Sequence, residues 1–320
     1  MILSVSRRTD IPAFYSSWFM NRIHSGFLYV KNTFNANQIS KIPLTPDIVD
    51  FIVFWSKNPE PLLKFLPEIQ SIYGNAFYFQ YTINGYERDV EPEVPNLSDR
   101  IQTLMDISKK YGKKSVVWRY DPIFLSEKYN LVWHINRFSN IFEQVKPYID
   151  TCVISFIDIY SKTLRNTRHL YINSLTKEDQ NLFAEKFSGI IKNSNISLKT
   201  CSEEINLDAY KIKHNSCIDK ERIESISGYK IKAELDKQRD YCQCIKCVDI
   251  GQYNTCSHGC KYCYANYNQE KVQEAIAAHL DDSPLLTGDL PSNCKITVHG
   301  KAKSIKISKI GTKFTQDSLI

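Results

Sequence analysis

The sequence predicts an α/β protein whose core is a full or partial (β/α) barrel of the TIM-like kind, followed by a cysteine-rich C-terminal region. Up to about residue 200, short runs rich in β-branched and aromatic residues alternate with amphipathic stretches of helical length, which is the rhythm of a parallel sheet. Six or more such units follow one another without a linker, which favours one barrel over two sheets. After residue 200 the strand signals fade, and cysteines and charges crowd together.

Six segments of the first 200 residues are predicted as strands, because each is a short run rich in Val, Ile, Phe or Tyr. They are Ile2–Ser6, Asp50–Trp55, Ala76–Ile83, Ser115–Tyr120, Thr151–Ile157 and Ile196–Thr200. A weaker strand, Phe27–Lys31, is expected at an edge or in an excursion from the sheet.

Four helices are expected between these strands. Two have a capping residue: Ser98 before Asp99–Tyr111, and Thr176 before an acidic first turn and a helix that runs to about Lys192. The other two are Pro59–Tyr73, which ends at a glycine, and Ser126–Val145, which ends before a proline.

The most distinctive segment is the run from Thr255 to Ala265, in which Cys256, Cys260 and Cys263 have a Cys-x3-Cys-x2-Cys spacing. Three thiolates on one short loop can hold three irons of a four-iron cluster and leave the fourth iron open to a non-protein ligand. A closed zinc site needs a fourth protein ligand, and zinc ligands usually come as two Cys-x2-Cys pairs. The spacing therefore favours an open-iron cluster, with zinc as the alternative.

This loop, with Tyr262 before its last cysteine and Tyr264-Ala265 after it, resembles the cluster loop of radical S-adenosylmethionine (SAM) enzymes. In that superfamily SAM chelates the open iron, and reduction of the cluster releases a 5′-deoxyadenosyl radical that takes a hydrogen atom from a substrate. The resemblance implies a 4Fe-4S cluster on these three thiols, SAM as a partner, and an electron donor such as flavodoxin or ferredoxin.

In radical SAM enzymes the cluster loop usually follows the first strand, so the order in this chain looks circularly permuted. On this interpretation Val248–Tyr253 replaces the cluster-bearing strand, and the N-terminal strand lies beside it in space. Tyr267–Leu280 is the expected helix after the loop. The Gly-Gly-Glu segment that often binds the SAM amino group is absent, and Asp10 is the candidate for that role.

Polar side chains collect where the expected strands end, and in a parallel barrel the reacting groups come from these ends. Arginine suits the carboxylate of SAM, and acidic groups suit its ribose hydroxyls, whereas structural ion pairs are the alternative explanation. The catalytic candidates are Arg7, Asp10, Lys57, Arg119 and Asp158. The cofactor-binding candidates are Arg8, Gln80, Asp121, Ser155 and Tyr262.

Seven cysteines lie outside the loop. Cys152, inside an apolar strand, is expected to be a core residue, and Cys294 has no evident companion. The run Cys-Gln-Cys-Ile-Lys-Cys just before the loop is too dense to assign to packing and indicates a second metal site. The preferred ligands of a second, auxiliary four-iron cluster are Cys201, Cys217, Cys242 and Cys244, with Cys247 as a substitute. Reduced thiols with one adventitious metal are the alternative.

Nearly the whole chain resembles a bacterial family of unknown function whose cysteine-rich C-terminus is similar to the radical SAM cluster. The shared segments are Ser-Arg-Arg-Thr-Asp-Ile-Pro from Ser6, Trp-Ser-Lys-Asn-Pro from Trp55, the run from Gln238-Arg239 to Asp249-Ile-Gly, Tyr253-Asn-Thr-Cys, and Tyr262-Cys-Tyr-Ala-Asn266. The resemblance implies a superfamily and no substrate. The Tyr-Cys-Tyr-Ala loop is reminiscent of radical SAM enzymes that repair DNA lesions, whereas a second cluster is more typical of enzymes that modify peptides.

Composition sets the remaining limits. The chain has 320 residues, 42% of them hydrophobic, so it can bury a large core. The apolar start before two arginines is the wrong order and length for a signal peptide, and no segment approaches the roughly 20 apolar residues of a membrane helix. We therefore expect a cytoplasmic protein with no membrane partner, a barrel core over residues 1–200, and an iron–sulfur region over 201–320 with a tail from about 283.

The charge balance leaves the partner open. The 41 basic and 35 acidic residues are a mild excess, and the most basic stretch, Lys295 to Lys313, is either a solvated tail or a contact to nucleic acid. The substrate of a radical SAM reaction is therefore expected to be a nucleic acid or a peptide. The alternative function is a non-catalytic regulatory or nucleic-acid-binding protein whose cysteines hold zinc or an iron–sulfur cluster.

Overall fold

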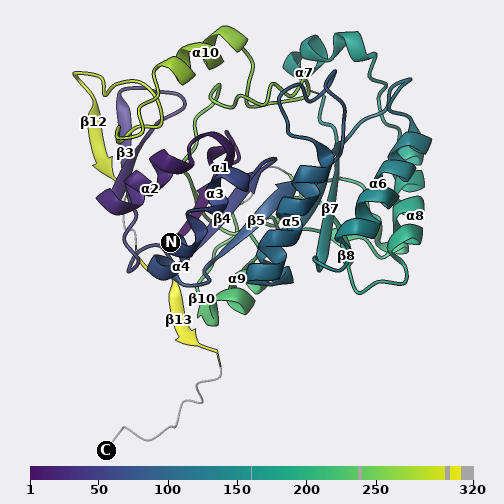
Figure 1. Cartoon of the computed structure of the whole chain (residues 1–320), viewed down its shortest axis with the longest axis horizontal. Coiled ribbons are helices and arrows are strands. Elements are labelled where there is room, and N and C mark those ends of the chain that lie inside the picture. Colours follow the sequence, from purple (N-terminus) through teal and green to yellow (C-terminus); the bar gives the residue numbers. More distant parts are fainter. Residues whose placement is uncertain (160, 237–239, 300–302, 311–320) are drawn as a thin grey trace, which may run out of the picture.

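The computed structural model describes residues 1–159, 161–236, 240–299 and 303–310. Its main feature is one eight-stranded sheet with the order β11-β1-β4-β5-β6-β7-β8-β9, in which every neighbouring pair is parallel (Figure 1). No strand pairing joins β9 to β11 in the described part of the chain, so the sheet is open. The predicted α/β class with a parallel sheet is confirmed.

Each strand predicted in the first 200 residues is present in this sheet, with ends shifted by up to three residues. The sheet consists of β1 (Ile2–Val5), β4 (Phe51–Ser56), β5 (Phe77–Thr82), β6 (Val116–Ile123), β7 (Thr151–Phe156), β8 (Ser197–Thr200), β9 (Lys213–His214) and β11 (Val248–Asp249). β11 pairs with β1 through Leu3 opposite Val248 and Ser4 opposite Asp249. The predicted neighbourhood of the late strand and the N-terminal strand is therefore confirmed, although the late strand is shorter than expected.

Two small sheets lie outside the main one. β3 (Gln38–Pro43) pairs with β2 (Phe27–Lys31) on one side and with β12 (Lys295–Val298) on the other, while β10 (Tyr229–Ile231) pairs with β13 (Lys306–Lys309). The excursion predicted for Phe27–Lys31 is confirmed. The lysine-rich C-terminal stretch contains β12 and β13, and its residues 300–302 and 311–313 lie outside the described residues.

Helices connect the strands and cover one face of the sheet. They are α1 (Ile11–Phe14), α2 (Ser16–Ser25), α3 (Glu60–Leu63), α4 (Leu66–Tyr73), α5 (Leu97–Tyr111), α6 (Leu131–Val145), α7 (Ser161–Asn166), α8 (Lys177–Ile191), α9 (Lys220–Ser227) and α10 (Gln269–Ala277), with short 3-10 turns at Lys113–Ser115, Arg168–Leu170 and Asp208–Tyr210. α10 confirms the helix predicted after the cysteine-rich loop, in a shorter form.

Three helix starts differ from or refine the predictions. Thr176 caps α8 in a reciprocal capping box with Asp179, as the sequence predicts. Ser98 is wrong as a cap, because α5 already begins at Leu97 and Ser98 lies in its first turn. The stretch Pro59–Tyr73 is broken into α3 and α4, because Pro67 cannot donate the backbone hydrogen bond that a continuous helix requires. α6 begins later than predicted, where Asn130 accepts a hydrogen bond from the backbone of Trp133.

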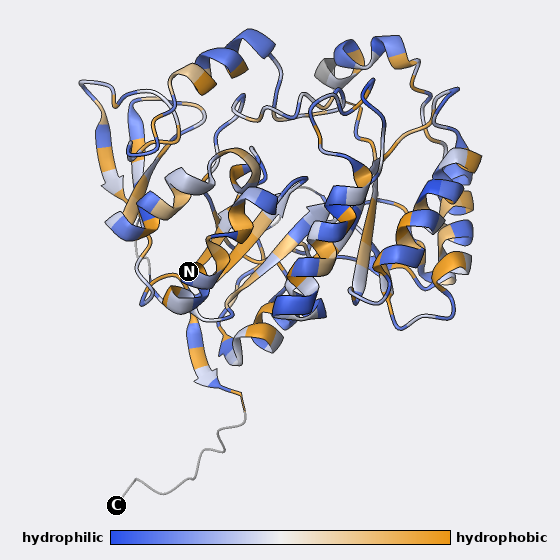
Figure 2. Cartoon of the chain, viewed as in Figure 1, coloured by the Kyte–Doolittle hydropathy of each residue, from blue (hydrophilic) through white to orange (hydrophobic). Residues whose placement is uncertain are grey.

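The two faces of the sheet are covered by different parts of the chain. Alternate strand residues such as Leu3, Phe54 and Trp118 pack against α2, α4, α5, α6 and α8. The other face, which includes Ile2 and Tyr78, packs against residues 217–245 and α9. Figure 2 shows the apolar strands between helices whose outer faces are polar. Burial on both faces explains why these strands are continuous apolar runs in the sequence.

No helix in the described ranges has both the length and the apolar character needed to cross a lipid bilayer.

His134 is a buried polar residue in the helical layer. Its Nδ1 lies 2.9 Å from the hydroxyl of Tyr120, and its Nε2 lies 2.8 Å from the carbonyl oxygen of Phe124. Since a carbonyl can only accept, Nε2 carries the proton and Nδ1 accepts from the tyrosine. Burial lowers the pKa of His134 to about 4, so the imidazole is neutral in the folded protein.

His134 makes the stability of the fold depend on pH. An unfolded histidine binds a proton near pH 6.5, whereas folded His134 does so only near its pKa of about 4, so stability falls as the pH falls through this window. Between about pH 7.5 and about pH 5 we expect this group to lower the free energy of unfolding by about 2 kcal/mol. Urea denaturation at both pH values measures it in the wild type and in His134→Gln. Equal losses in the two proteins would contradict the assignment.

Candidate functional site

Residues 255–265, here called the cysteine loop, follow β11 and cross the carboxyl ends of the neighbouring strands. The hydroxyl of Tyr15 donates to the carbonyl oxygen of Thr255 at 2.5 Å. The loop also bonds the segment after β5, through Glu93 N to His258 O at 3.2 Å and Lys261 N to Val90 O at 3.0 Å. The loop is therefore attached to two parts of the chain that precede it by more than 150 residues.

Asp249, the last residue of β11, ties this strand to β1. Its carboxylate accepts hydrogen bonds from Ser4 Oγ at 2.8 Å, Ser6 Oγ at 2.6 Å and the backbone N–H of Arg7 at 2.9 Å. Gly251 follows at a point where no side chain fits, because a Cβ there would lie 1.9 Å from Ser6 Oγ. The Asp-Ile-Gly sequence therefore brings the start of the cysteine loop against the end of β1.

The three thiols of the loop are half-buried and influence one another. Burial raises the pKa of Cys256, Cys260 and Cys263; Asp10 and the other two thiols raise that of Cys256 further, whereas Lys57 opposes the rise at Cys260 and Cys263. Among the residues that the structure describes, no three His, Cys, Asp or Glu side chains converge closely enough to hold a metal ion as they stand.

Lys57 places a positive charge beside these thiols. Its Nζ donates to Glu91 Oε1 at 2.8 Å and lies 5.3 Å from the ring centroid of Tyr262. The Tyr262 hydroxyl donates to the same carboxylate oxygen. Burial raises the pKa of Glu91, but Lys57 and Arg100 more than offset this effect, so the net shift is downward and Glu91 is ionised. The buried carboxylate thus fixes both a lysine and a loop tyrosine.

Asp10 and His258 link the loop to the ends of β1 and β4. The Asp10 carboxylate accepts from Ser56 Oγ and Lys57 N, both at 2.7 Å, from Ala13 N at 3.0 Å, and from His258 Nε2 at 2.8 Å. These bonds use the four lone-pair positions of a carboxylate. The predicted role of Asp10 in binding the SAM amino group stays a prediction, and it requires that one of these bonds be given up.

Arg7 and Arg8 also lie at the cysteine loop. The carbonyl oxygen of Arg7 accepts from the hydroxyl of Tyr264 at 2.6 Å, and its guanidinium lies 3.4 Å from Cys247 Sγ. The Arg8 guanidinium lies 5.3 Å from the ring centroid of Tyr253. Arg7, Arg8, Asp10, Lys57 and Tyr262 are thus the predicted site residues that the fold brings to this loop.

Arg119, Asp121 and Gln80 form a second group, which lies at the other cysteines. The Arg119 guanidinium donates to Asp121 through Nε at 3.1 Å, to Gln80 Oε1 at 3.2 Å, and to Cys217 Sγ at 3.1 Å. Gln80 in turn donates to the carbonyl oxygen of Cys217 at 2.8 Å. These predicted catalytic and cofactor-binding residues surround Cys217, and no contact joins them to Cys256, Cys260 or Cys263 in the described residues.

Ser155 and Asp158 belong to a third place, at the ends of β7 and β8. Ser155 Oγ and the backbone N–H of Phe156 donate to Glu203 Oε1, at 2.9 and 3.0 Å. Burial raises the pKa of Glu203 to about 7, against the effect of these two bonds, and the nearby Asp158 adds to the rise. The predicted polar ring is therefore divided among three places.

The second set of cysteines does converge. Cys201 Sγ lies 3.3 Å from Cys217 Sγ, the thiols of Cys217 and Cys244 are hydrogen-bonded, and so are those of Cys244 and Cys242. Cys247, the predicted substitute, contacts Arg7 instead. Cys152 is fully buried in β7, which confirms it as a core residue.

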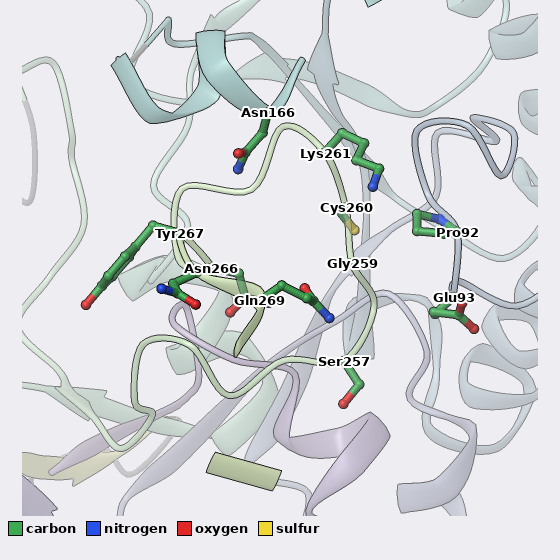
Figure 3. Close-up of a pocket in the computed structure, with 11 residues that line it drawn as sticks. Pro92, Glu93, Asn166, Ser257, Gly259, Cys260, Lys261, Asn266, Tyr267 and Gln269 are labelled. Atoms are coloured by element: carbon green, nitrogen blue, oxygen red, sulfur yellow. The ribbon is translucent and has the colours of Figure 1, made fainter. Parts of the chain in front are cut away.

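A cavity of about 430 Å³ opens beside the cysteine loop, with Cys260 in its wall (Figure 3). Asn166, Asn266, Asn268 and Gln269 line it with amides, and Pro92 and Glu93 border it from the segment after β5. The volume is in the range of small-molecule sites, and the lining offers hydrogen-bond donors and acceptors. The cavity is therefore suited to a polar ligand that reaches the Cys260 thiol.

Sequence reasoning missed several residues that build this site. His258 lies between the loop cysteines and could have been singled out as a possible ligand. Glu91 gave no signal, because it lies in an irregular segment and its partner Tyr262 is 171 residues away. The bonding of Asp249 to β1 follows from the register of a strand pair, which spacing alone does not reveal.

The comparisons with known proteins agree with this picture in extent. The model of a family described as "Domain of unknown function (DUF1848)" matches residues 2–265. The match includes both cysteine sets and stops at the end of the cysteine loop. No curated protein matches the chain.

Gly251 offers a test of the contact between β11 and β1. In Gly251→Ala the new methyl group would meet Ser6 Oγ and Ser6 Cβ, so we expect the free energy of unfolding to fall by about 1–3 kcal/mol. Gly189→Ala is the matched control, because Gly189 lies in α8 with open space around it and alanine favours helices. Urea denaturation compares the two variants. A Gly251→Ala protein as stable as Gly189→Ala would contradict the close packing.

Proposed function

We propose a radical SAM activity for this chain, which belongs to the DUF1848 family. On this proposal Cys256, Cys260 and Cys263 hold a 4Fe-4S cluster with one open iron, and the protein reductively cleaves SAM there. The observation that supports it best is the position of the cysteine loop. It follows a strand that pairs in parallel with β1, and ligands of parallel α/β sheets bind at the carboxyl ends of the strands.

The donor set fits a cluster that keeps one iron free of protein ligands. The obvious fourth ligand in the loop is His258, but its Nε2 donates to Asp10 and its Nδ1 lies 3.4 Å from the carbonyl oxygen of Glu93. A closed Cys3His zinc site would have to break both contacts. Three thiols without a fourth protein ligand therefore favour the iron–sulfur centre over zinc.

When bound, such a cluster with SAM supplies one-electron reductive cleavage of the sulfonium. The chain's own residues provide the charge that the site needs. Lys57, held by Glu91, lies beside Cys260 and Cys263 and favours their thiolate forms. Tyr262 is fixed by the same carboxylate, so one buried group orients two sides of the loop.

The cavity beside Cys260 is the proposed SAM site. SAM carries a carboxylate, an amino group, ribose hydroxyls and adenine, all of which can hydrogen-bond to the amides of Asn166, Asn266 and Gln269. Lys261, also in the cavity wall, offers a cation to the SAM carboxylate.

The proposal extends to the fold and the partners. We interpret the open eight-stranded sheet as a partial, circularly permuted radical SAM barrel, in which β11 and β1 take the places of the first two strands. The reductant is then a small electron carrier such as flavodoxin or ferredoxin, and the substrate is a nucleic acid or a peptide.

SAM cleavage tests the proposal directly. After anaerobic reconstitution we expect about four irons at this site and, with dithionite and SAM, release of 5′-deoxyadenosine. Cys260→Ala should lose this product, because one thiolate ligand is missing, whereas Cys294→Ala should retain it. Chromatographic detection of 5′-deoxyadenosine measures both. A protein with a full cluster that leaves SAM intact would sink the proposal.

His258 separates the open cluster from a closed zinc site. In His258→Gln the amide can still donate to Asp10, so we expect the iron bound by the loop to stay within about 20% of the wild-type content. If His258 were a metal ligand, the variant would lose most of the metal bound by the loop. Elemental analysis of the purified, reconstituted proteins distinguishes the two results.

A further inference from the structure

Four buried cysteines from three separate segments meet on the face of the sheet that the helical layer leaves uncovered. Cys201 directly follows β8, Cys217 lies between β9 and α9, and Cys242 with Cys244 lies in the segment that leads to β11. Their exposed fractions are 8%, 3%, 6% and 4%. Thiols so far apart in sequence gather in this way only when the fold has a use for their proximity, since an apolar residue fills a core equally well.

The spacing of the sulfurs indicates what they would bind. Cys201 Sγ and Cys217 Sγ are 3.3 Å apart, and each further thiol is hydrogen-bonded to the next, in the order Cys217, Cys244, Cys242. Zinc binds thiolates at about 2.3 Å in a tetrahedron, which places the sulfurs about 3.8 Å from one another. The thiolates of a four-iron cluster bind four different irons and stand further apart. The close chain therefore favours a single ion, which side-chain rotations from a chain into a tetrahedron would admit.

Donors around the sulfurs form the second layer that such a site requires. Arg119 donates to Cys217 Sγ at 3.1 Å, Asn215 Nδ2 lies 3.5 Å from the same atom, and the backbone N–H of Ile218 lies 3.4 Å from Cys244 Sγ. Four thiolates and a divalent ion carry a net charge of −2, and the Arg119 guanidinium partly compensates this charge inside the protein. Gln80 and Asp121 fix the orientation of this arginine.

We propose that Cys201, Cys217, Cys242 and Cys244 bind one structural zinc ion, which links the two ends of the open sheet. β8 and β9 form one end of the strand order, and β11 forms the other. A metal held by residues next to both ends takes the place of the strand pairing that is missing between them. This site is independent of the proposed SAM chemistry and departs from the second iron–sulfur cluster that the sequence suggested.

Metal analysis of the full-length triple variant Cys256→Ala/Cys260→Ala/Cys263→Ala tests the site without the cysteine loop's metal. We expect about one zinc per chain and no more than traces of iron. Adding Cys217→Ser should lower the zinc content at least tenfold, while adding Cys247→Ser should leave it unchanged. A brown, iron-containing triple variant would overturn the assignment to zinc, and a metal-free one would overturn the site itself.

Cobalt keeps the proposal testable if the Cys217→Ser protein fails to fold. Exchange of zinc for Co²⁺ in the folded triple variant should give the visible absorption of a tetrahedral thiolate complex, with about one cobalt per chain. A spectrum without thiolate bands would exclude the four-sulfur site. Loss of SAM cleavage with zinc retained would count against the proposed function alone, so the two proposals fail separately.

Discussion

The parallel pairing of β11 with β1 is the constraint on which the site depends. β11 is only two residues long, so its backbone bonds alone would hold it weakly. Asp249 adds bonds to two serines and a backbone amide of the β1 end, and Gly251 lets the two backbones approach without a side chain between them. If this contact were lost, the cysteine loop would have no fixed place relative to Arg7, Lys57 and Glu91.

Buried carboxylates divide the work of positioning that loop. Asp10 binds the loop through His258 and at the same time caps α1 and holds the end of β4. Glu91 binds it through Tyr262 and holds Lys57. Each acid is paired with donors from more than one segment, which repays the cost of burying its charge. The same arrangement brings the positive charge of Lys57 to the thiols instead of leaving it in solvent.

The sequence was informative where burial imposes a simple pattern. Strands covered on both faces become apolar runs, so the strands of the first 200 residues could be located, and the place of β11 followed from the resemblance of the loop after it. Local chemistry misled at Ser98 and at Pro67, where one residue shifts or breaks a helix. The polar ring could not be resolved, because Arg119 and Ser155 follow neighbouring strands yet point to different partners. Glu91 and His258 depend on contacts across the whole chain, which no local pattern records.

The order of the elements also bears on how the protein is made. A ribosome delivers β1 and the next six strands of the main sheet long before it delivers β11, and domains fold progressively as the chain emerges. The β1 edge therefore waits, unpaired, until nearly four fifths of the polypeptide has been synthesised. An edge of this kind attracts other strands, so the nascent chain passes through a stage in which chaperone protection of β1 matters most. Insertion of any metal into the cysteine loop can only follow that stage.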